Sequence, residues 1–313
     1  MPVSRPDRAP GKPRLVATDL DGTLLRSDGT VSARTRAALL AAEDAGIEVV
    51  FVTARPPRWL GPLRELVGGH GRVVCLGGAA VWDLATERPL EVCGFADDDA
   101  RSLVADLRVA VPDIRLALER VDGPTFDPGF RSADDGAADP VDPSSVVRGV
   151  EDTLTASVRP VVGKILARAP GALPARDNPA THPVVVAEGQ SPAQEAFFDQ
   201  VRDAVGQRGH LAYSGAAGLA ELLAPTVSKD AALARWCARL GIEPHDVWAF
   251  GDMPNDLPML RWAGRSFAVA NAHPDVQGTA SDGASSNDDD GVARVLEAAL
   301  AGRPSGDRRL SGT

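Results

Sequence analysis

Two acidic residues directly follow an apolar segment near the start of the chain. Asp19 and Asp21 come after residues 14–18 (RLVAT), and Gly22 comes next. The apolar run predicts a buried strand, and ligands of open α/β sheets bind at the carboxyl ends of the strands. The sequence therefore predicts two carboxylates at such an edge, where Gly22 allows a sharp turn. Taken alone, the segment also fits an Asp-rich turn without chemistry.

A second acidic group follows another apolar segment. Residues 245–250 (HDVWAF) precede Gly-Asp-Met-Pro-Asn-Asp, in which Asp252 is the first carboxylate. If the two strands are neighbours, Asp252 meets Asp19 and Asp21, and each pair of carboxylates repels by roughly 1–4 kcal/mol near a surface. A hard cation relieves this repulsion. Oxygen ligands without nearby His or Cys favour Mg²⁺, which usually binds beside a substrate phosphate.

Two further segments could hold a phosphate group. Thr53 ends the apolar run 47–52 and offers a hydroxyl close to backbone N–H groups. Lys229 opens a predicted helix, whose first N–H groups and dipole favour an anion. A solvated lysine at a helix start is the alternative. The chain has only two other lysines, Lys12 and Lys164, so each lysine is a candidate for a specific role.

Apolar runs and helical patterns alternate in both end regions of the chain. Strands are predicted at 14–18, 47–52, 72–76, 245–250 and 265–271, and helices at 32–46, 228–241, 257–264 and 291–302. This alternation predicts βαβ units and a Rossmann-like, doubly wound parallel sheet. The middle of the chain mixes a hairpin at 81–92, helices at 97–111 and 191–207, a loop at 127–143, and strands at 164–169 and 183–188. The predicted fold class is α/β with an inserted α+β domain.

The predicted domains follow from these patterns. The core domain takes 14–78 and 215–302, the inserted domain, which the resemblance described below identifies as a cap, takes 79–214, and 1–13 and 303–313 are loose tails.

Composition restricts the class of partner and the location. A formal net charge of −10 disfavours nucleic acid, because no basic stripe offsets the repulsion from its backbone. No stretch of eighteen apolar residues and no apolar leader is present, which predicts no membrane association and a cytoplasmic location. Three widely spaced cysteines fit a reducing compartment.

The joint order of these motifs resembles the haloacid dehalogenase superfamily. DLDGTLL, VTAR, SKDAAL and GDMPNDLPM are similar to its four motifs in turn. An insert between the second and third motifs is similar to the type C2 cap of Cof-like metabolite phosphatases. One position departs from that subfamily, since Gly77 stands where its members usually have Asn. The departure puts an inherited substrate assignment in doubt and leaves the core chemistry intact.

The resemblance implies roles for the acidic residues. Asp19 is the expected nucleophile, which forms an aspartyl-phosphate, and Asp21 is the expected general acid and later base. The side chains of Asp19 and Asp252 and the backbone carbonyl of Asp21 are expected to hold Mg²⁺. Asn255 and Asp256 are expected to support the site from outside, with Asp256 alternatively a ligand through water.

The resemblance also implies a phosphate-binding set. Thr53, Ala54, Lys229 and the backbone of Leu20 and Asp21 are expected to contact the transferred phosphoryl group. The implied activity is hydrolysis of a small phosphorylated metabolite. The alternatives are a phosphomutase or phosphotransferase that uses the same phosphoenzyme, and a non-catalytic phosphate or metal sensor.

Overall fold

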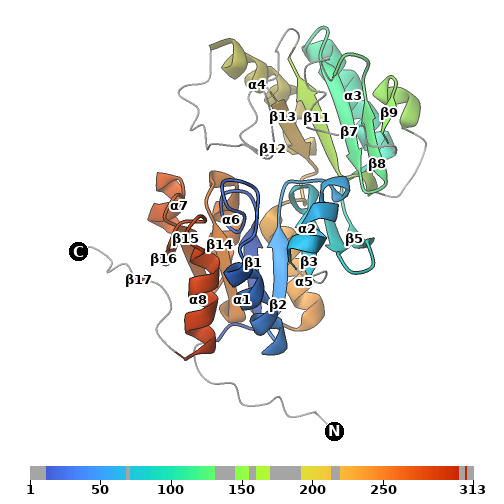
Figure 1. Ribbon diagram of the computed structural model, residues 1–313. Helices are drawn as coiled ribbons and strands as arrows, with labels where there is room; N and C mark the ends of the chain where they lie inside the picture. The colour runs from blue at the N-terminus through green and yellow to red at the C-terminus, as the bar shows by residue number, and fades with distance from the viewer. Residues whose placement is uncertain are drawn as a thin grey trace. The chain divides into compact units, whose positions relative to one another are not determined.

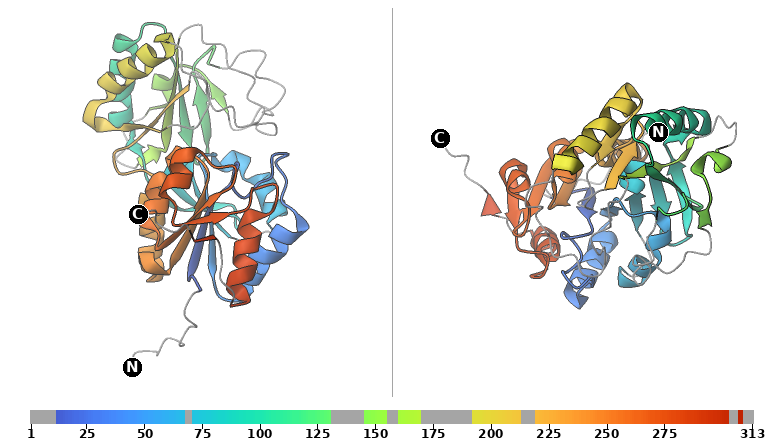
Figure 2. Two further views of the ribbon diagram at one scale, coloured as in Figure 1. Left: turned by 90° about the vertical axis from the view of Figure 1, so that its left-hand side faces the viewer. Right: turned by 90° about the horizontal axis from the view of Figure 1, so that it is seen from above.

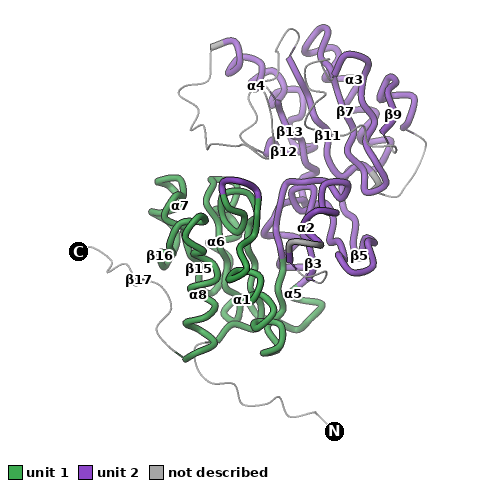
Figure 3. The backbone as a smooth tube through the Cα atoms, in the orientation of Figure 1, with its two compact units in different colours: residues 1–26, 30–50, 237–313 green, residues 27–29, 51–236 purple. Residues whose placement is uncertain are grey.

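The structure is a computed structural model, in which the chain forms two compact units (Figure 3). It describes residues 12–67, 71–130, 145–154, 160–169, 192–212, 219–302 and 307–308. Unit 1 comprises residues 1–26, 30–50 and 237–313, and unit 2 comprises residues 27–29 and 51–236. The boundaries fall inside strand β2 (Glu48–Val52) and inside helix α5 (Lys229–Leu240).

Unit 1 is built on a mainly parallel sheet. Besides β2, its strands are β1 (Leu15–Asp19), β14 (Val247–Gly251), β15 (Arg265–Val269), β16 (Asp282–Ala284) and β17 (Asp307–Arg308). The order is β17-β16-β15-β14-β1-β2, and the pairs from β1 to β16 are parallel, whereas β17 is antiparallel. Every residue of β1 and β14 is buried, including the polar Thr18 and Asp19 that end β1, as expected for central strands of a parallel sheet.

Helices connect and cover these strands. They are α1 (Ala33–Asp44), α6 (Leu257–Trp262), α7 (Pro274–Thr279) and α8 (Gly291–Leu300), with short 3₁₀ turns η6 (Pro244–Asp246) and η7 (Pro254–Asp256). The Ser32 hydroxyl accepts a hydrogen bond from Thr35 N at 3.0 Å and so begins α1. Helices α1 and α8 pack side by side, and both lie in front of the strands in Figure 1.

Unit 2 begins at the end of β2. This strand is followed by η1 (Pro57–Trp59), α2 (Gly61–Leu66), β3 (Arg72–Cys75), η2 (Leu76–Gly78), β4 (Ala80–Asp83) and β5 (Arg88–Val92). Strands β2 and β3 are neighbours, and β3, β4 and β5 form an antiparallel meander.

The rest of unit 2 contains a second sheet. Its strands are β7 (Arg115–Arg120), β8 (Gly123–Phe126), β9 (Val146–Val147), β11 (Lys164–Arg168), β12 (His210–Ala212) and β13 (Leu219–Leu223), in the order β12-β13-β11-β7-β8-β9. Helices α3 (Asp97–Ala110) and α4 (Pro192–Val205) lie side by side in both views of Figure 2. The smaller elements are β6 (Phe95–Ala96), β10 (Pro160–Val162), η4 (Val150–Thr153) and η5 (Gly206–Arg208).

The predicted fold class is confirmed, and the predicted helices at both ends of the chain are present. Strands β7, β8, β12 and β13 were not predicted. The predicted strand at 183–188 lies outside the described residues, as do most of the two tails and of the loop at 127–143. The predicted bounds of the core and cap domains remain a prediction.

Candidate active site

Two parallel strands of unit 1 bring acidic residues to the same edge of the sheet. Strands β1 and β14 pair with Leu15 opposite Val247 and Thr18 opposite Phe250. Asp19, the last residue of β1, is therefore level with the end of β14, and Asp252 follows directly. The predicted neighbourhood of the two acidic segments is thus present.

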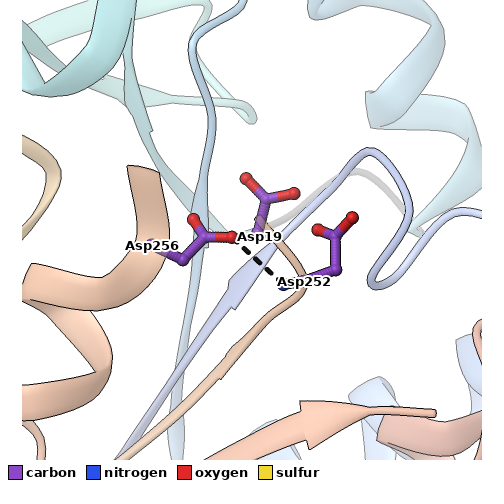
Figure 4. Close-up of side chains that lie close together, drawn as sticks. All are labelled: Asp19, Asp252 and Asp256. Carbon is purple, nitrogen blue, oxygen red and sulfur yellow. Dashed lines mark hydrogen bonds between the residues drawn. The ribbon is translucent and has the colours of Figure 1, made fainter. Parts of the chain in front are cut away.

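Three buried carboxylates converge at this edge (Figure 4). Asp19, Asp252 and Asp256 are 7%, 1% and 0% exposed, and each offers an oxygen atom within 4.8 Å of the others. At that separation, two charges repel by about 3.5 kcal/mol with an effective dielectric constant of 20. The cluster is therefore a strong attractor for a cation. The side chain of Asp21 is not part of it, and Asp21 is exposed.

The Asp256 side chain is hydrogen-bonded to the backbone at Asp252 and Met253. Its Oδ2 accepts hydrogen bonds from the N–H groups of Asp252 and Met253, both at 3.1 Å. The turn η7 returns the chain so that this carboxylate reaches the end of β14. A Cβ atom on Gly251 would lie 2.7 Å from the Asp256 Cβ, so only glycine permits the approach. The structure thus places Asp256 inside the carboxylate cluster, closer to the centre than the sequence suggested.

Asp252 is held from the opposite side by the turn after β1. Thr23 Oγ1 donates a hydrogen bond to Asp252 Oδ1 at 2.8 Å. Gly22 has a φ of +82°, and a Cβ atom there would lie 2.4 Å from Asp252 Oδ2. The sequence interpretation gave Thr23 no role, although its place in the motif D-x-D-G-T was the available signal.

An amide network fixes the same turn. Asn271 Nδ2 donates to Gly22 O at 2.7 Å, and Asn271 Oδ1 accepts from Asn287 N at 3.0 Å. Asn287 Nδ2 donates to Leu25 O at 2.9 Å. These two asparagines were also missed, because nothing in their spacing relates them to residues 249 and 262 positions earlier.

The backbone after Asp19 is oriented by this turn. The carbonyl oxygen of Leu20 accepts from Leu24 N at 3.1 Å and from Leu25 N at 2.8 Å. Because a trans peptide directs its C=O and N–H to opposite sides, the N–H of Asp21 is directed away from the turn. This orientation suits the predicted contact of the Leu20–Asp21 backbone with a phosphoryl group.

The donor set fits a hard divalent cation. All three converging side chains offer carboxylate oxygens. Asn255 Oδ1 is buried and has no hydrogen-bond partner among the described residues, so it can accept from a water molecule of a hydrated ion. Of the groups predicted to hold the ion, the structure brings together the side chains of Asp19 and Asp252, and it adds that of Asp256.

The predicted phosphate-binding side chains belong to unit 2. Thr53 is 1% exposed, and Lys229 is 6% exposed at the first turn of α5. The burial of Lys229 excludes the alternative of a solvated lysine. A Cβ atom on Gly78 would lie 2.1 Å from the Ser228 carbonyl oxygen, so η2 packs directly on the start of α5.

Comparison with known proteins identifies the family. Residues 16–125 and 177–296 match the haloacid dehalogenase-like hydrolases, and the chain belongs to this family. Since the matched residues are most of the chain, the predicted family and the predicted enzyme class, a hydrolase, are confirmed.

Individual relatives extend over nearly the whole chain. The 5-amino-6-(5-phospho-D-ribitylamino)uracil phosphatase YwtE of Bacillus subtilis is 26% identical over 303 residues, which cover 93% of this chain and 99% of YwtE. The pyridoxal phosphate phosphatase YbhA of Escherichia coli is 24% identical over 285 residues, which cover 90% of this chain and 97% of YbhA. SMU.1108c from Streptococcus mutans has the same fold, with a TM-score of 0.72, 23% identity, and coverage of 93% of this chain and 100% of that chain.

None of the helices in the described part of the chain combines the length and apolar character that a membrane span requires.

Proposed function

We propose that this hydrolase is a Mg²⁺-dependent phosphatase of small phosphorylated metabolites that forms an aspartyl-phosphate on Asp19. The observation that carries the proposal is the convergence of Asp19, Asp252 and Asp256 at the carboxyl ends of β1 and β14. The names of YwtE and YbhA describe phosphatases of two different small metabolites, which supports phosphoric monoester hydrolysis as the reaction class.

The residues of the chain divide the first step between them. A carboxylate oxygen of Asp19 attacks phosphorus, and the bond from phosphorus to the ester oxygen breaks. Asp21 gives its proton to the departing oxygen, which leaves as a neutral alcohol. The Asp21 side chain is exposed and is not part of the carboxylate cluster.

Water completes the reaction in the second step. Its oxygen attacks phosphorus, the bond from phosphorus to Asp19 breaks, and Asp21 takes the proton of the water. Inorganic phosphate leaves, and both carboxyl groups return to their starting states. This order uses one residue as acid and then as base.

Charge neutralisation is the other requirement. Asp19, Asp252 and the Asp21 carbonyl, together with Asp256, would hold Mg²⁺, which would supply positive charge to offset the negative charge of the phosphoryl group. Lys229 would supply a second positive charge, and Thr53 with the Ala54 N–H would bind phosphoryl oxygens.

The test is phosphate release from a panel of phosphorylated metabolites, including flavin mononucleotide, pyridoxal phosphate and sugar phosphates, with Mg²⁺ and with EDTA. Asp19→Asn should abolish turnover, because an amide is a poor nucleophile, whereas the exposed Asp44→Asn should retain it. Single turnover in ¹⁸O-water should leave no label on Asp19, since water attacks phosphorus. No phosphate release from any panel member would refute the proposal.

A further inference from the structure

A buried lysine of unit 2 contacts the segment that carries Thr53. Lys164 begins β11, and its side chain is 5% exposed. Its Nζ donates to Glu221 Oε2 at 2.6 Å and to the carbonyl oxygen of Ala54 at 3.1 Å. A cation at this depth requires partners, and one of the two is the main chain of the predicted phosphate-binding segment.

The contact fixes one particular peptide group. The carbonyl of Ala54 and the N–H of Arg55 belong to the same planar unit. Lys164 binds its oxygen, and the N–H of Arg55 donates to Thr53 Oγ1 at 3.1 Å. The peptide is therefore held at both ends, by an ammonium on one side and by the Thr53 hydroxyl on the other.

The two flanking carbonyls are held differently. Thr53 O accepts from Gly77 N at 3.2 Å, and Arg55 O accepts from Leu76 N at 2.9 Å. Both donors are backbone groups of η2. The Ala54 carbonyl between them is bound instead by a side chain, that of Lys164.

The orientation of this peptide determines what the Thr53 hydroxyl can do. Since Thr53 Oγ1 already accepts a hydrogen bond from the Arg55 N–H, the Thr53 O–H group can donate to another acceptor. No acceptor for that proton is found in the described part of the chain. A phosphoryl oxygen is the acceptor that the proposed function supplies.

Building on the proposed function, we propose that Lys164 is a positioning residue for phosphate binding. It holds the peptide between Ala54 and Arg55 so that the N–H of Arg55 meets Thr53 Oγ1 and the hydroxyl proton is directed to substrate phosphate. Without this ammonium, the peptide is free to rotate, and the Arg55 N–H then no longer fixes the direction of the Thr53 hydroxyl.

The charge of Lys164 is balanced within the second sheet. Glu221 lies on the neighbouring strand β13, where it pairs with Leu166, two residues along β11 from Lys164, and is 5% exposed. On the other side of Lys164, Glu119 is its partner across β7 and forms an ion pair with Arg58. Apolar residues of similar volume usually stabilise a fold as well as a buried ion pair does. A specific orienting task accounts for the lysine better than stability alone.

The decisive comparison is between Glu221→Gln and the double variant K164M/E221Q. Glu221→Gln keeps the lysine and an acceptor for it, so KM should stay within about twofold of the parent. The double variant removes the donor to Ala54 without leaving a carboxylate buried alone. Its KM and its dissociation constant for inorganic phosphate, measured by calorimetry, should rise about tenfold, the equivalent of 1.4 kcal/mol. The kcat should change by less than about threefold, as for loss of uniform binding.

Two further measurements separate orientation from general damage. The amide of Arg55 should exchange with deuterium faster in K164M/E221Q than in Glu221→Gln. In a Thr53→Val background, removing Lys164 should change KM by less than about twofold, because the hydroxyl that it orients is already gone. Lys164→Arg, which keeps a donor, should bind phosphate within about threefold of the parent protein.

Unchanged phosphate binding in a folded K164M/E221Q protein, or an equal loss in the Thr53→Val background, would overturn the inference. If the double variant does not fold, K164L/E221L, which also removes the donor and leaves no carboxylate buried alone, takes its place with the same expected rise in KM. If the parent protein hydrolyses no phosphate ester, the proposed function fails, whereas phosphate calorimetry and the exchange of Arg55 still test Lys164.

Discussion

The carboxylate cluster makes an unusual prediction for Asp252→Asn: the variant should be more stable than the parent protein when no metal is present. Asn has the same shape as Asp, and its Oδ1 can still accept from Thr23, which donates to Asp252 at 2.8 Å. The backbone N–H of residue 252 still donates to Asp256. The substitution therefore removes one negative charge and leaves the geometry in place.

The magnitude follows from the separation of the charges. Each of the two pairs that Asp252 forms, with Asp19 and Asp256, lies within 4.8 Å and costs about 3.5 kcal/mol when all groups are ionised, or about 7 kcal/mol together. The parent protein can instead avoid the repulsion by protonating one carboxyl group, which at pH 7 costs about 4 kcal/mol for an ordinary aspartate pKa of 3.9. The substitution therefore cannot remove more than about 4 kcal/mol of repulsion. A weaker hydrogen bond from Thr23 subtracts about 1 kcal/mol. The net gain in unfolding free energy is at most about 3 kcal/mol.

Magnesium should reverse this order. At a concentration of about 100 times its dissociation constant, the ion stabilises the parent by about 2.7 kcal/mol, which raises Tm by roughly 5–10 °C. Asp252→Asn, with a neutral amide in place of a ligand, should gain little. Thermal unfolding at pH 7 in EDTA and across a Mg²⁺ titration measures both effects, and Asp44→Asn is the surface control. An equal Mg²⁺ shift in parent and variant, or a variant that is less stable in EDTA, would refute the assignment of this cluster as a cation site.

Two other predictions concern packing and thiols. Gly78→Ala should lower the unfolding free energy by about 2–5 kcal/mol, because its Cβ would lie 2.1 Å from a backbone carbonyl oxygen at the start of α5. Gly29→Ala is the control, since Gly29 also has a positive φ but a Cβ there would have nothing within 4 Å, and it should lower the unfolding free energy less. Denaturant unfolding checks the difference, and equal losses would show that backbone strain alone is responsible. Burial raises the pKa of Cys75 and Cys237 to about 12, so both thiols stay protonated and unreactive at neutral pH. Cys93 is less buried, and Cys93→Ser should abolish most of the rapid labelling of the native protein by a thiol reagent.

The core elements could be predicted because each local signal agrees with the tertiary structure. The helix predicted at 32–46 is capped by Ser32, a residue type favoured at that position, and the mainly apolar runs of β1 and β14 are buried throughout. Here propensity, capping and burial all favour the same element.

The second sheet was harder to predict because its strands carry helix-forming residues. Strand β13 reads Leu-Ala-Glu-Leu-Leu and β7 reads Arg-Leu-Ala-Leu-Glu-Arg, both of which fit a helix by propensity. They are strands because β11 lies between them and pairs with both. The glutamates Glu119 and Glu221 are tolerated inside because Arg58 and Lys164 neutralise them. These partners are distant in sequence, so no local pattern reveals them.

The same reasoning explains which part of the site the sequence could and could not reveal. Strand ends place Asp19 and Asp252 together, since parallel strands in register end at one edge. The position of Asp256 depends instead on the turn η7, where two backbone N–H groups donate to its carboxylate and the absent side chain of Gly251 leaves room. The Asp256 carboxylate turns back to the end of β14 because the N–H groups of Asp252 and Met253 donate to it. Backbone hydrogen bonding therefore determines which acidic residues join the cluster, and residue type alone does not.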